Sequence, residues 1–217
     1  MATAEVQDIA ISERLARLAA EARAETDASG ADAGSMSLGW ILDRLHERAF
    51  GLFLLILALP CCIPFLYGVP QIVALPLLFV SAQITAGRRA PWLPEGLRRR
   101  QVAIERLEEL SRRAEPWLRR VEGVCRPRLT ALTRPPLDRI VGLALMLFSA
   151  SILVPLPGTN TVPGFAVVLV AVGLLERDGA LVGAGSALGM VWILTLLTAG
   201  ATLAAILFGW IGLGEAP

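Results

Sequence analysis

Residues 155–178 read PLPGTNTVPGFAVVLVAVGLLERD, and the rest of the chain is organised around this stretch. A charge-free apolar run, 140–154, leads into it, and a second apolar run, 165–175, leads out. Between the runs lie three prolines, two glycines and the polar residues 159–161. Proline and glycine break a helix, and the freed backbone groups need partners inside lipid. The loop is therefore predicted to be buried in protein or to line a wet cavity, which makes it the first candidate site.

The distribution of charge predicts an integral membrane protein. Hydrophobic residues make up 55% of the 217, and three runs contain no charged residue or histidine: 49–87, 140–175 and 179–214. Each run exceeds the roughly 20 residues that cross a bilayer once. The alternative, in which these runs are core helices of a soluble domain, does not fit the average composition of such domains.

The first run is broken by Gly68 and by prolines at 60, 64, 70 and 76. Its two arms are each about 23–26 Å long at 1.5 Å per residue, shorter than the roughly 30 Å hydrocarbon core. A re-entrant hairpin, or two tightly turned short helices, is therefore expected.

The second run repeats the first. Residues 47–52 (ERAFGL) match 138–143 (DRIVGL), and the Val-Pro pair at 69–70 matches 162–163. The alternative is a chance match between apolar segments. Both copies have arginines at each end, namely Arg44, Arg48, Arg88 and Arg89 for the first and Arg134, Arg139 and Arg177 for the second. If these arginines stay cytoplasmic, each hairpin enters and returns on the cytoplasmic side, and the repeats are parallel.

The segment between the copies is basic and amphipathic. From 88 to 139 there are 14 arginines and seven acidic residues, and the Glu/Arg pairs 108/112, 109/113, 115/119 and 122/126 have i,i+4 spacing. Pro116 and Pro127 are expected to divide it into helical pieces that lie on the cytoplasmic membrane face. The orientation of the protein in the membrane and contact with anionic lipid explain this positive charge, so no nucleic-acid partner is expected.

The two ends of the chain carry weaker signals. Residues 1–24 are predicted to form at most a short surface helix, and Ser37 is predicted to cap a helix with the apolar stripe Leu38, Ile41, Leu42 and Leu45. His46, the one histidine, is assigned a solvated surface role. The last run has GxxxG spacing at 179/183 and 185/189, which favours close helix packing. It forms either one span or a hairpin that turns at 198–200.

The predicted fold class is an all-α integral membrane protein. It comprises a flexible cytoplasmic N-terminal segment (1–37), an interfacial helix with the first Pro/Gly-broken hairpin (38–87), a basic amphipathic cytoplasmic connector (88–137), the second broken hairpin (138–178) and one or two C-terminal transmembrane helices (179–217).

The broken helices suggest where a ligand would bind. The half-helices that begin near Pro70 and Pro163 point partially positive N-termini at the loops, which suits an anion, while the carbonyl ends of the incoming arms suit a cation. The candidate substrate or ion site therefore comprises Tyr67, Gly68, Pro70, Gln71, Pro157, Gly158, Thr159, Asn160, Thr161, Pro163 and Gly164. In the alternative, these polar groups only satisfy the broken backbone.

Charged candidates for proton handling lie at the boundary of the second hairpin: Glu176, Arg177 and Asp178. Proton-coupled exchange usually needs an ionisable group within the membrane, and these are the nearest. Structural pairing with arginine is the alternative. No catalytic motif, metal-ligand spacing or cofactor motif is visible, so neither an enzyme nor a bound metal or cofactor is predicted.

The sequence PLPGTNTVPGFAVVLVAVGLLERDG resembles the ExoD family of bacterial inner-membrane proteins, named for exopolysaccharide synthesis. The match rests on Pro157, Gly158, Asn160, Pro163, Gly164, Gly173, Leu174, Arg177, Asp178 and Gly179. The resemblance runs from about 38 to 214, with the first 37 residues outside it. It implies a multi-pass inner-membrane protein that takes part in exopolysaccharide production and, in some members, tolerance of alkaline medium.

Three functions stay open at this stage. The chain transports an ion or small solute through the paired Pro-rich loops, flips a lipid carrier for polysaccharide assembly, or serves that machinery as a non-transporting scaffold. The expected partners are the lipid bilayer and, through the resemblance, exopolysaccharide assembly proteins. Whether the chain forms a homo-oligomer stays open.

Overall fold

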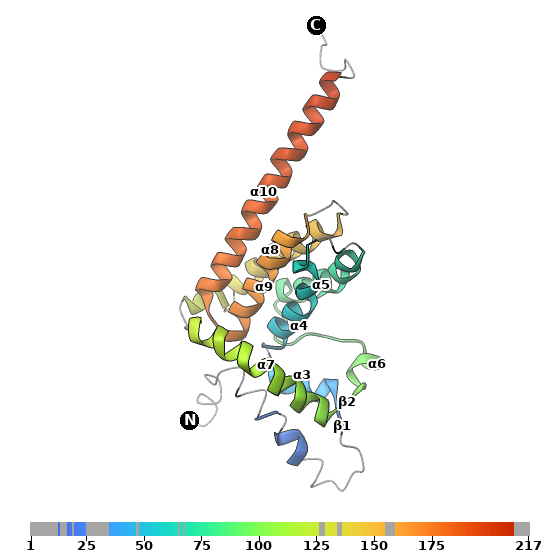
Figure 1. The fold of residues 1–217 in the computed structure, drawn as a ribbon, viewed down its shortest axis with the longest axis vertical. Coiled ribbons are helices and arrows are strands. Elements are labelled where there is room, and N and C mark those ends of the chain that lie inside the picture. The colour runs from blue at the N-terminus through green and yellow to red at the C-terminus, as the bar shows by residue number, and fades with distance from the viewer. Residues whose placement is uncertain are drawn as a thin grey trace.

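The structure is a computed structural model that describes residues 13, 17–18, 20–24, 35–46, 48–64, 66, 68–125, 129–133, 136–154 and 159–210. This part of the chain is mostly helical (Figure 1). Its elements are β1 (Ser35–Ser37), α3 (Leu38–Leu45), α4 (Arg48–Ala58), the 3₁₀ helix η1 (Leu59–Cys62), α5 (Val69–Thr85), α6 (Glu95–Arg98), β2 (Gln101–Ala103), α7 (Ile104–Val124), the 3₁₀ helix η2 (Thr130–Thr133), α8 (Leu137–Leu153), α9 (Thr161–Glu176) and α10 (Gly179–Trp210).

Four short apolar helices form the centre of the molecule and pack crosswise. Helix α4 lies mainly along α9, and α5 lies along α8, so each arm of one hairpin contacts the opposite arm of the other. Between them is one buried core, which includes Leu54, Leu77, Leu145, Phe148 and Val167. Each helix buries one apolar stripe in this core, and its outward-facing side chains stay exposed.

Two glycines let the crossed helices approach closely. A Cβ on Gly51 of α4 would lie 2.8 Å from the Ala171 carbonyl oxygen of α9, and one on Gly142 of α8 would lie 2.6 Å from the Thr85 nitrogen of α5. These are the glycines of the matched ERAFGL and DRIVGL sequences. In both hairpins the same sequence position therefore meets the second arm of the other hairpin.

Helix α10 is continuous over its 32 residues and projects past the bundle (Figure 1). Within it, Gly179–Phe208 is the one single helix, among the residues described, that is long and apolar enough to cross a membrane. The predicted alternative, a turn at 198–200, does not form: α10 runs unbroken through these residues, and Thr198 Oγ1 donates to the Leu194 carbonyl at 3.0 Å within the helix. The GxxxG pattern is used at Gly185 and Gly189, which abut α9 and Phe148 of α8.

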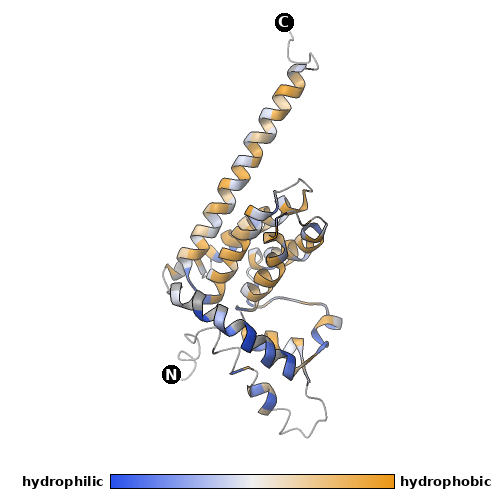
Figure 2. Cartoon of the chain, viewed as in Figure 1, coloured by the Kyte–Doolittle hydropathy of each residue, from blue (hydrophilic) through white to orange (hydrophobic). Residues whose placement is uncertain are grey.

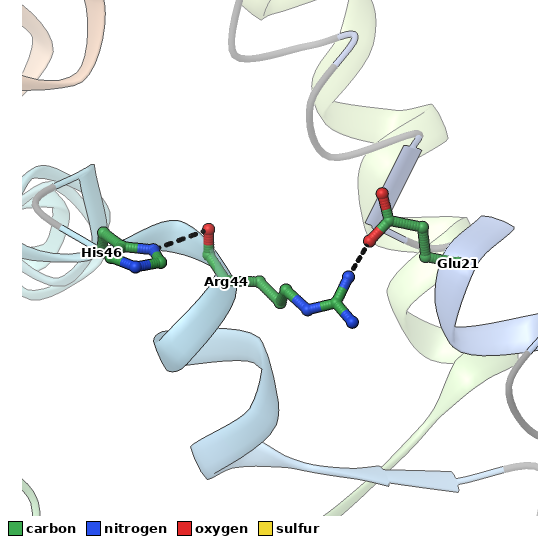
Figure 3. Close-up of polar contacts among 3 residues, drawn as sticks. All are labelled: Glu21, Arg44 and His46. Atoms are coloured by element: carbon green, nitrogen blue, oxygen red, sulfur yellow. Dashed lines mark hydrogen bonds and ion pairs between the residues drawn. The ribbon is translucent and has the colours of Figure 1, made fainter. Parts of the chain in front are cut away.

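A polar layer covers one end of the bundle. Figure 2 shows apolar residues over α4, α5, α8, α9 and α10, whereas α7 is mostly hydrophilic. Helix α3 begins as predicted, with Ser37 Oγ accepting from the Trp40 N–H at 3.2 Å, and its stripe packs against Leu18. In Figure 3, Arg44 reaches Glu21 while His46 Nδ1 lies 3.3 Å from the Arg44 carbonyl oxygen. His46 is exposed, in accord with its predicted surface role.

The layer departs from expectation at two points. The described chain is mostly helical, as expected, but it also has a three-residue antiparallel ladder between β1 and β2 that was not predicted. Pro116 does not divide the connector but lies inside α7, where helix bonds on both sides outweigh the one that proline removes. Of the expected ion pairs, Glu109–Arg113 and Glu115–Arg119 form, whereas Glu108 pairs with Arg23. Pro127 lies outside the described residues.

Candidate functional site

The described residues that flank the two Pro-rich turns, 59–64 and 68–70 in the first hairpin and 159–164 in the second, lie at one end of the bundle, here named the turn end. The 3₁₀ helix η1 packs against α9, and a Cβ on Gly164 would lie 2.9 Å from Cys61 Cβ. Helices α5 and α9 begin at Val69 and Thr161, so Pro70 and Pro163 both lie in a first helical turn, as predicted. At this end, η1 of the first hairpin therefore contacts α9 of the second hairpin directly.

The polar groups of the turn end have unequal roles. Gln71 Oε1 accepts from the Gly68 N–H at 3.0 Å, so this side chain serves the broken backbone. Asn160 stands at the N-cap of α9 but makes no capping bond with its side chain. Its Oδ1 is buried and has no hydrogen-bond partner within the described part of the chain. Thr159 and Thr161 are half-buried beside it. The remaining predicted loop residues, Tyr67, Pro157 and Gly158, lie outside the described residues.

A pocket of about 240 Å³ lies at the opposite end of the bundle, here named the arginine end. The first turns of α4 and α8 supply Arg48 and Arg139, and the residues that follow α5 and α9 supply Arg88, Arg89 and Arg177. Asp138 is the one acid in the lining, and the remaining wall is formed by Phe50, Ile84, Gly87, Thr133 and Leu174. All four ends of the two hairpins therefore contribute arginine to one cavity, here named the arginine pocket.

Local backbone geometry places two of these arginines. Arg177 ends α9 in the left-handed region, with φ of 54°. In this position the Asp178 N–H reaches back to the Gly173 carbonyl at 2.8 Å and closes the helix end. The guanidinium of Arg139 lies against Gly87, which has φ of 74° and whose absent Cβ would be 2.8 Å from Arg139 Nη2. A side chain at Gly87 would occupy the space that this guanidinium fills.

The charged candidates at 176–178 separate in the structure. Arg177 lines the pocket, whereas Asp178 is buried and its Oδ1 accepts from the Ala180 N–H at 2.9 Å, which caps α10. Glu176 ends α9 and is half-buried. Its counterpart in the first copy, Gln83, holds the next segment through two bonds to the backbone of Trp92.

Two further observations concern where a ligand or a metal ion could bind. A second pocket, of about 520 Å³, lies between α3 and α6, where Asp43 and Arg98 form an ion pair at 2.7 Å. Among the residues that the structure describes, no three His, Cys, Asp or Glu side chains gather closely enough to hold a metal ion.

Sequence reasoning missed the arginine pocket as a site. The arginines at all four hairpin ends were visible, but they were interpreted as a signal of membrane orientation. Their convergence depends on the crosswise packing of α4 on α9 and α5 on α8, which the sequence pattern does not specify.

Comparison with known proteins bears on the family of the chain. A family model described as "Exopolysaccharide synthesis, ExoD" matches residues 11–198, which confirms the resemblance and corrects its range from about 38–214 to 11–198. Protein ExoD of Rhizobium meliloti is 32% identical over 156 residues, 70% of this chain and 65% of that protein. An uncharacterized Synechocystis protein is 31% identical over 155 residues, 70% of this chain and 72% of its own length. No solved structure matches.

Proposed function

Because the chain belongs to the ExoD family of exopolysaccharide synthesis proteins, we propose that it is a multi-pass protein of the bacterial inner membrane that acts in exopolysaccharide production. The family match carries the process, and the distribution of apolar side chains supports the location. Both are checked by deleting the gene and measuring exopolysaccharide yield, and by testing whether the protein stays in the membrane pellet at high pH.

The outer faces of the bundle support a membrane location. Exposed apolar side chains follow helical spacing on α5, at Ile72, Leu75 and Phe79, and on α8, at Ile140, Leu143 and Leu147. Helix α10 adds more, including Leu197 at 64% exposure. Large apolar side chains exposed repeatedly along three helices mark a membrane or interaction surface. With the arginine end placed in the cytoplasm, both hairpins enter the membrane and return to the same side.

Within the membrane, the proposed activity is transport of an ion or small solute. One observation carries it: the paired hairpins pack against each other at the turn end and hold a charged pocket at the arginine end. A site open to one side and closed to the other is what one state of an alternating-access transporter needs. The buried Asn160 Oδ1 at the turn end supplies a polar group along such a route.

Proteoliposomes test this activity. The purified chain should support flux of a charged solute down its gradient above the rate of empty liposomes. Arg139→Gln should reduce that flux, whereas Arg113→Gln, on the exposed face of α7, should not. Flux that equals that of empty liposomes under every anion and cation gradient would count against transport and favour the scaffold function.

A lipid-carrier flippase is the second candidate, and one observation favours it. Arg139 of the pocket is followed on α8 by the exposed stripe Ile140, Leu143 and Leu147. An acyl chain along this stripe would place its headgroup at the pocket. Movement of a fluorescent phospholipid between leaflets, measured by dithionite quenching, separates this candidate from solute transport.

A further inference from the structure

We propose that the arginine pocket binds a terminal phosphate group, carried either by a free phosphate or diphosphate or by a lipid headgroup. This inference rests on the proposed function, since it names the chemical class that the same pocket handles.

The charge of the pocket selects an anion with more than one negative charge. Five guanidinium groups and one carboxylate line a cavity of about 240 Å³. Arg48 is 6% exposed, so one of the positive charges is held out of water. The nearby Asp178 carboxylate is engaged at the N-terminus of α10 through Ala180. Arg177 is half-buried, whereas Arg88, Arg89 and Arg139 are exposed. Positive charges gathered around one cavity repel one another, and a multivalent anion offsets that repulsion more than a monovalent one does.

The arrangement of the guanidinium groups around one cavity fits phosphate. Lysine is absent from the chain, and all 20 of its Lys and Arg residues are arginine, so the pocket itself does not show a choice between the two. The pocket does show that guanidinium groups from four helix ends line one cavity. A guanidinium fork donates two parallel hydrogen bonds to phosphate oxygens, and several forks together surround a tetrahedral anion.

Arg139 is held in place for this role by its neighbour. Its guanidinium nitrogens Nη2 and Nε lie 2.8 and 2.9 Å from the position a Cβ would have on Gly87. Gly87 follows α5 at a left-handed φ of 74°, a conformation that glycine adopts without strain. The end of the first hairpin thus leaves room for an arginine of the second.

Arg177 occupies a position where glycine is the usual residue. It has φ of 54° at the end of α9, and a side chain in this region strains the backbone. Its side chain also lines the pocket. Backbone strain that a glycine would remove, at a residue that faces a cavity, points to a role for that side chain.

Binding to the purified full-length chain in nanodiscs of phosphatidylcholine tests the inference. Titration with inorganic pyrophosphate, followed by calorimetry, should give saturable binding. Arg139→Gln and Arg177→Gly should each weaken it about tenfold, the loss expected for one charge-assisted contact. Arg119→Gln is the matched control, because Arg119 pairs with Glu115 on α7 away from the pocket.

The Arg177→Gly variant guards against misfolding as an explanation. Glycine relieves the left-handed backbone, so this variant should melt at or above the temperature of the unchanged protein. Weaker binding in a protein that is no less stable then reports the lost guanidinium. A lower melting temperature in both pocket variants, with equal binding per folded molecule, would overturn the inference.

A second arm identifies the source of the phosphate. Nanodiscs that contain phosphatidic acid should compete with pyrophosphate more strongly than nanodiscs with phosphatidylglycerol at matched surface charge if a lipid phosphate enters the pocket. Equal competition, with pyrophosphate binding intact, assigns the pocket to a free anion. Absence of saturable binding from either source overturns the inference while leaving flux and exopolysaccharide yield as separate tests of the proposed function.

Discussion

The two ends of the hairpin pair differ in how they treat their polar groups. At the turn end, Gly164 lies against Cys61 and Gln71 bonds the Gly68 backbone, so broken helices are closed by packing and by local hydrogen bonds. At the arginine end, five like charges surround a cavity. The sequence that looks most irregular therefore lies at the packed turn end, and ordinary flanking arginines line the pocket at the other end.

The largest effect on stability is expected from a substitution that disrupts packing at the turn end. Gly164→Ala should destabilise the fold by about 1–3 kcal/mol, because the new methyl group meets the Cys61 backbone and Cβ, which cannot move independently of η1. Thermal and chemical unfolding in detergent measure the change. Gly200→Ala is the control: apart from the adjoining residues and backbone of its own helix, no atom lies within 4 Å of its Cβ position, and alanine is the better helix former. Equal stability of the two variants would show that the turn end is not tightly packed.

The next largest effect is expected at the arginine end and is measured as exopolysaccharide yield. Arg139→Gln should lower exopolysaccharide yield by up to about tenfold at matched membrane expression, the loss that one charge-assisted contact predicts. Arg139→Lys should recover part of the yield, since it keeps the charge but loses the planar fork. Yields that follow protein amount alone, in both variants, would remove the arginine pocket from the mechanism.

The fold could be predicted from the sequence where the preferences of a few neighbouring residues determine the local structure. Ser37 caps α3, Pro70 and Pro163 mark the helix starts, and the apolar run lengths predict short arms. The β1–β2 ladder was missed because three residues on each side are too few for an alternating pattern, and the pairing joins segments far apart in sequence. The arginine pocket was missed for the same reason, since its residues come from four helix ends.

A smaller effect concerns the boundary acid at the arginine end. Asp178→Ala should cost about 1 kcal/mol, because it removes the N-cap of α10, and Asp178→Asn should restore most of it since asparagine caps equally well. Thermal unfolding of the two variants separates the effect of losing the helix cap from the effect of losing only the negative charge. If asparagine were as harmful as alanine, the negative charge of Asp178 would be what the site needs.

The smallest effect is expected at Asn160. Its Oδ1 is buried without a partner in the described part of the chain, so Asn160→Ala should leave the stability within about 0.5 kcal/mol of the parent or raise it slightly. Thr198→Ala on exposed α10 is the comparison. Exopolysaccharide yield is measured on both: a greater loss for Asn160→Ala at equal stability would assign the turn end a direct role in transport.

The central claim is that both hairpins enter and leave the membrane at the arginine end, on the cytoplasmic side. It is tested most directly by Ala90→Cys and Asp138→Cys, one at each hairpin, in a chain without Cys61, Cys62 and Cys125. Both cysteines should resist an impermeant thiol reagent added to intact spheroplasts and react after permeabilisation. Rapid labelling of one position but not the other in intact spheroplasts would contradict the account, because the four arginine-bearing ends could not then share one pocket on one side of the membrane.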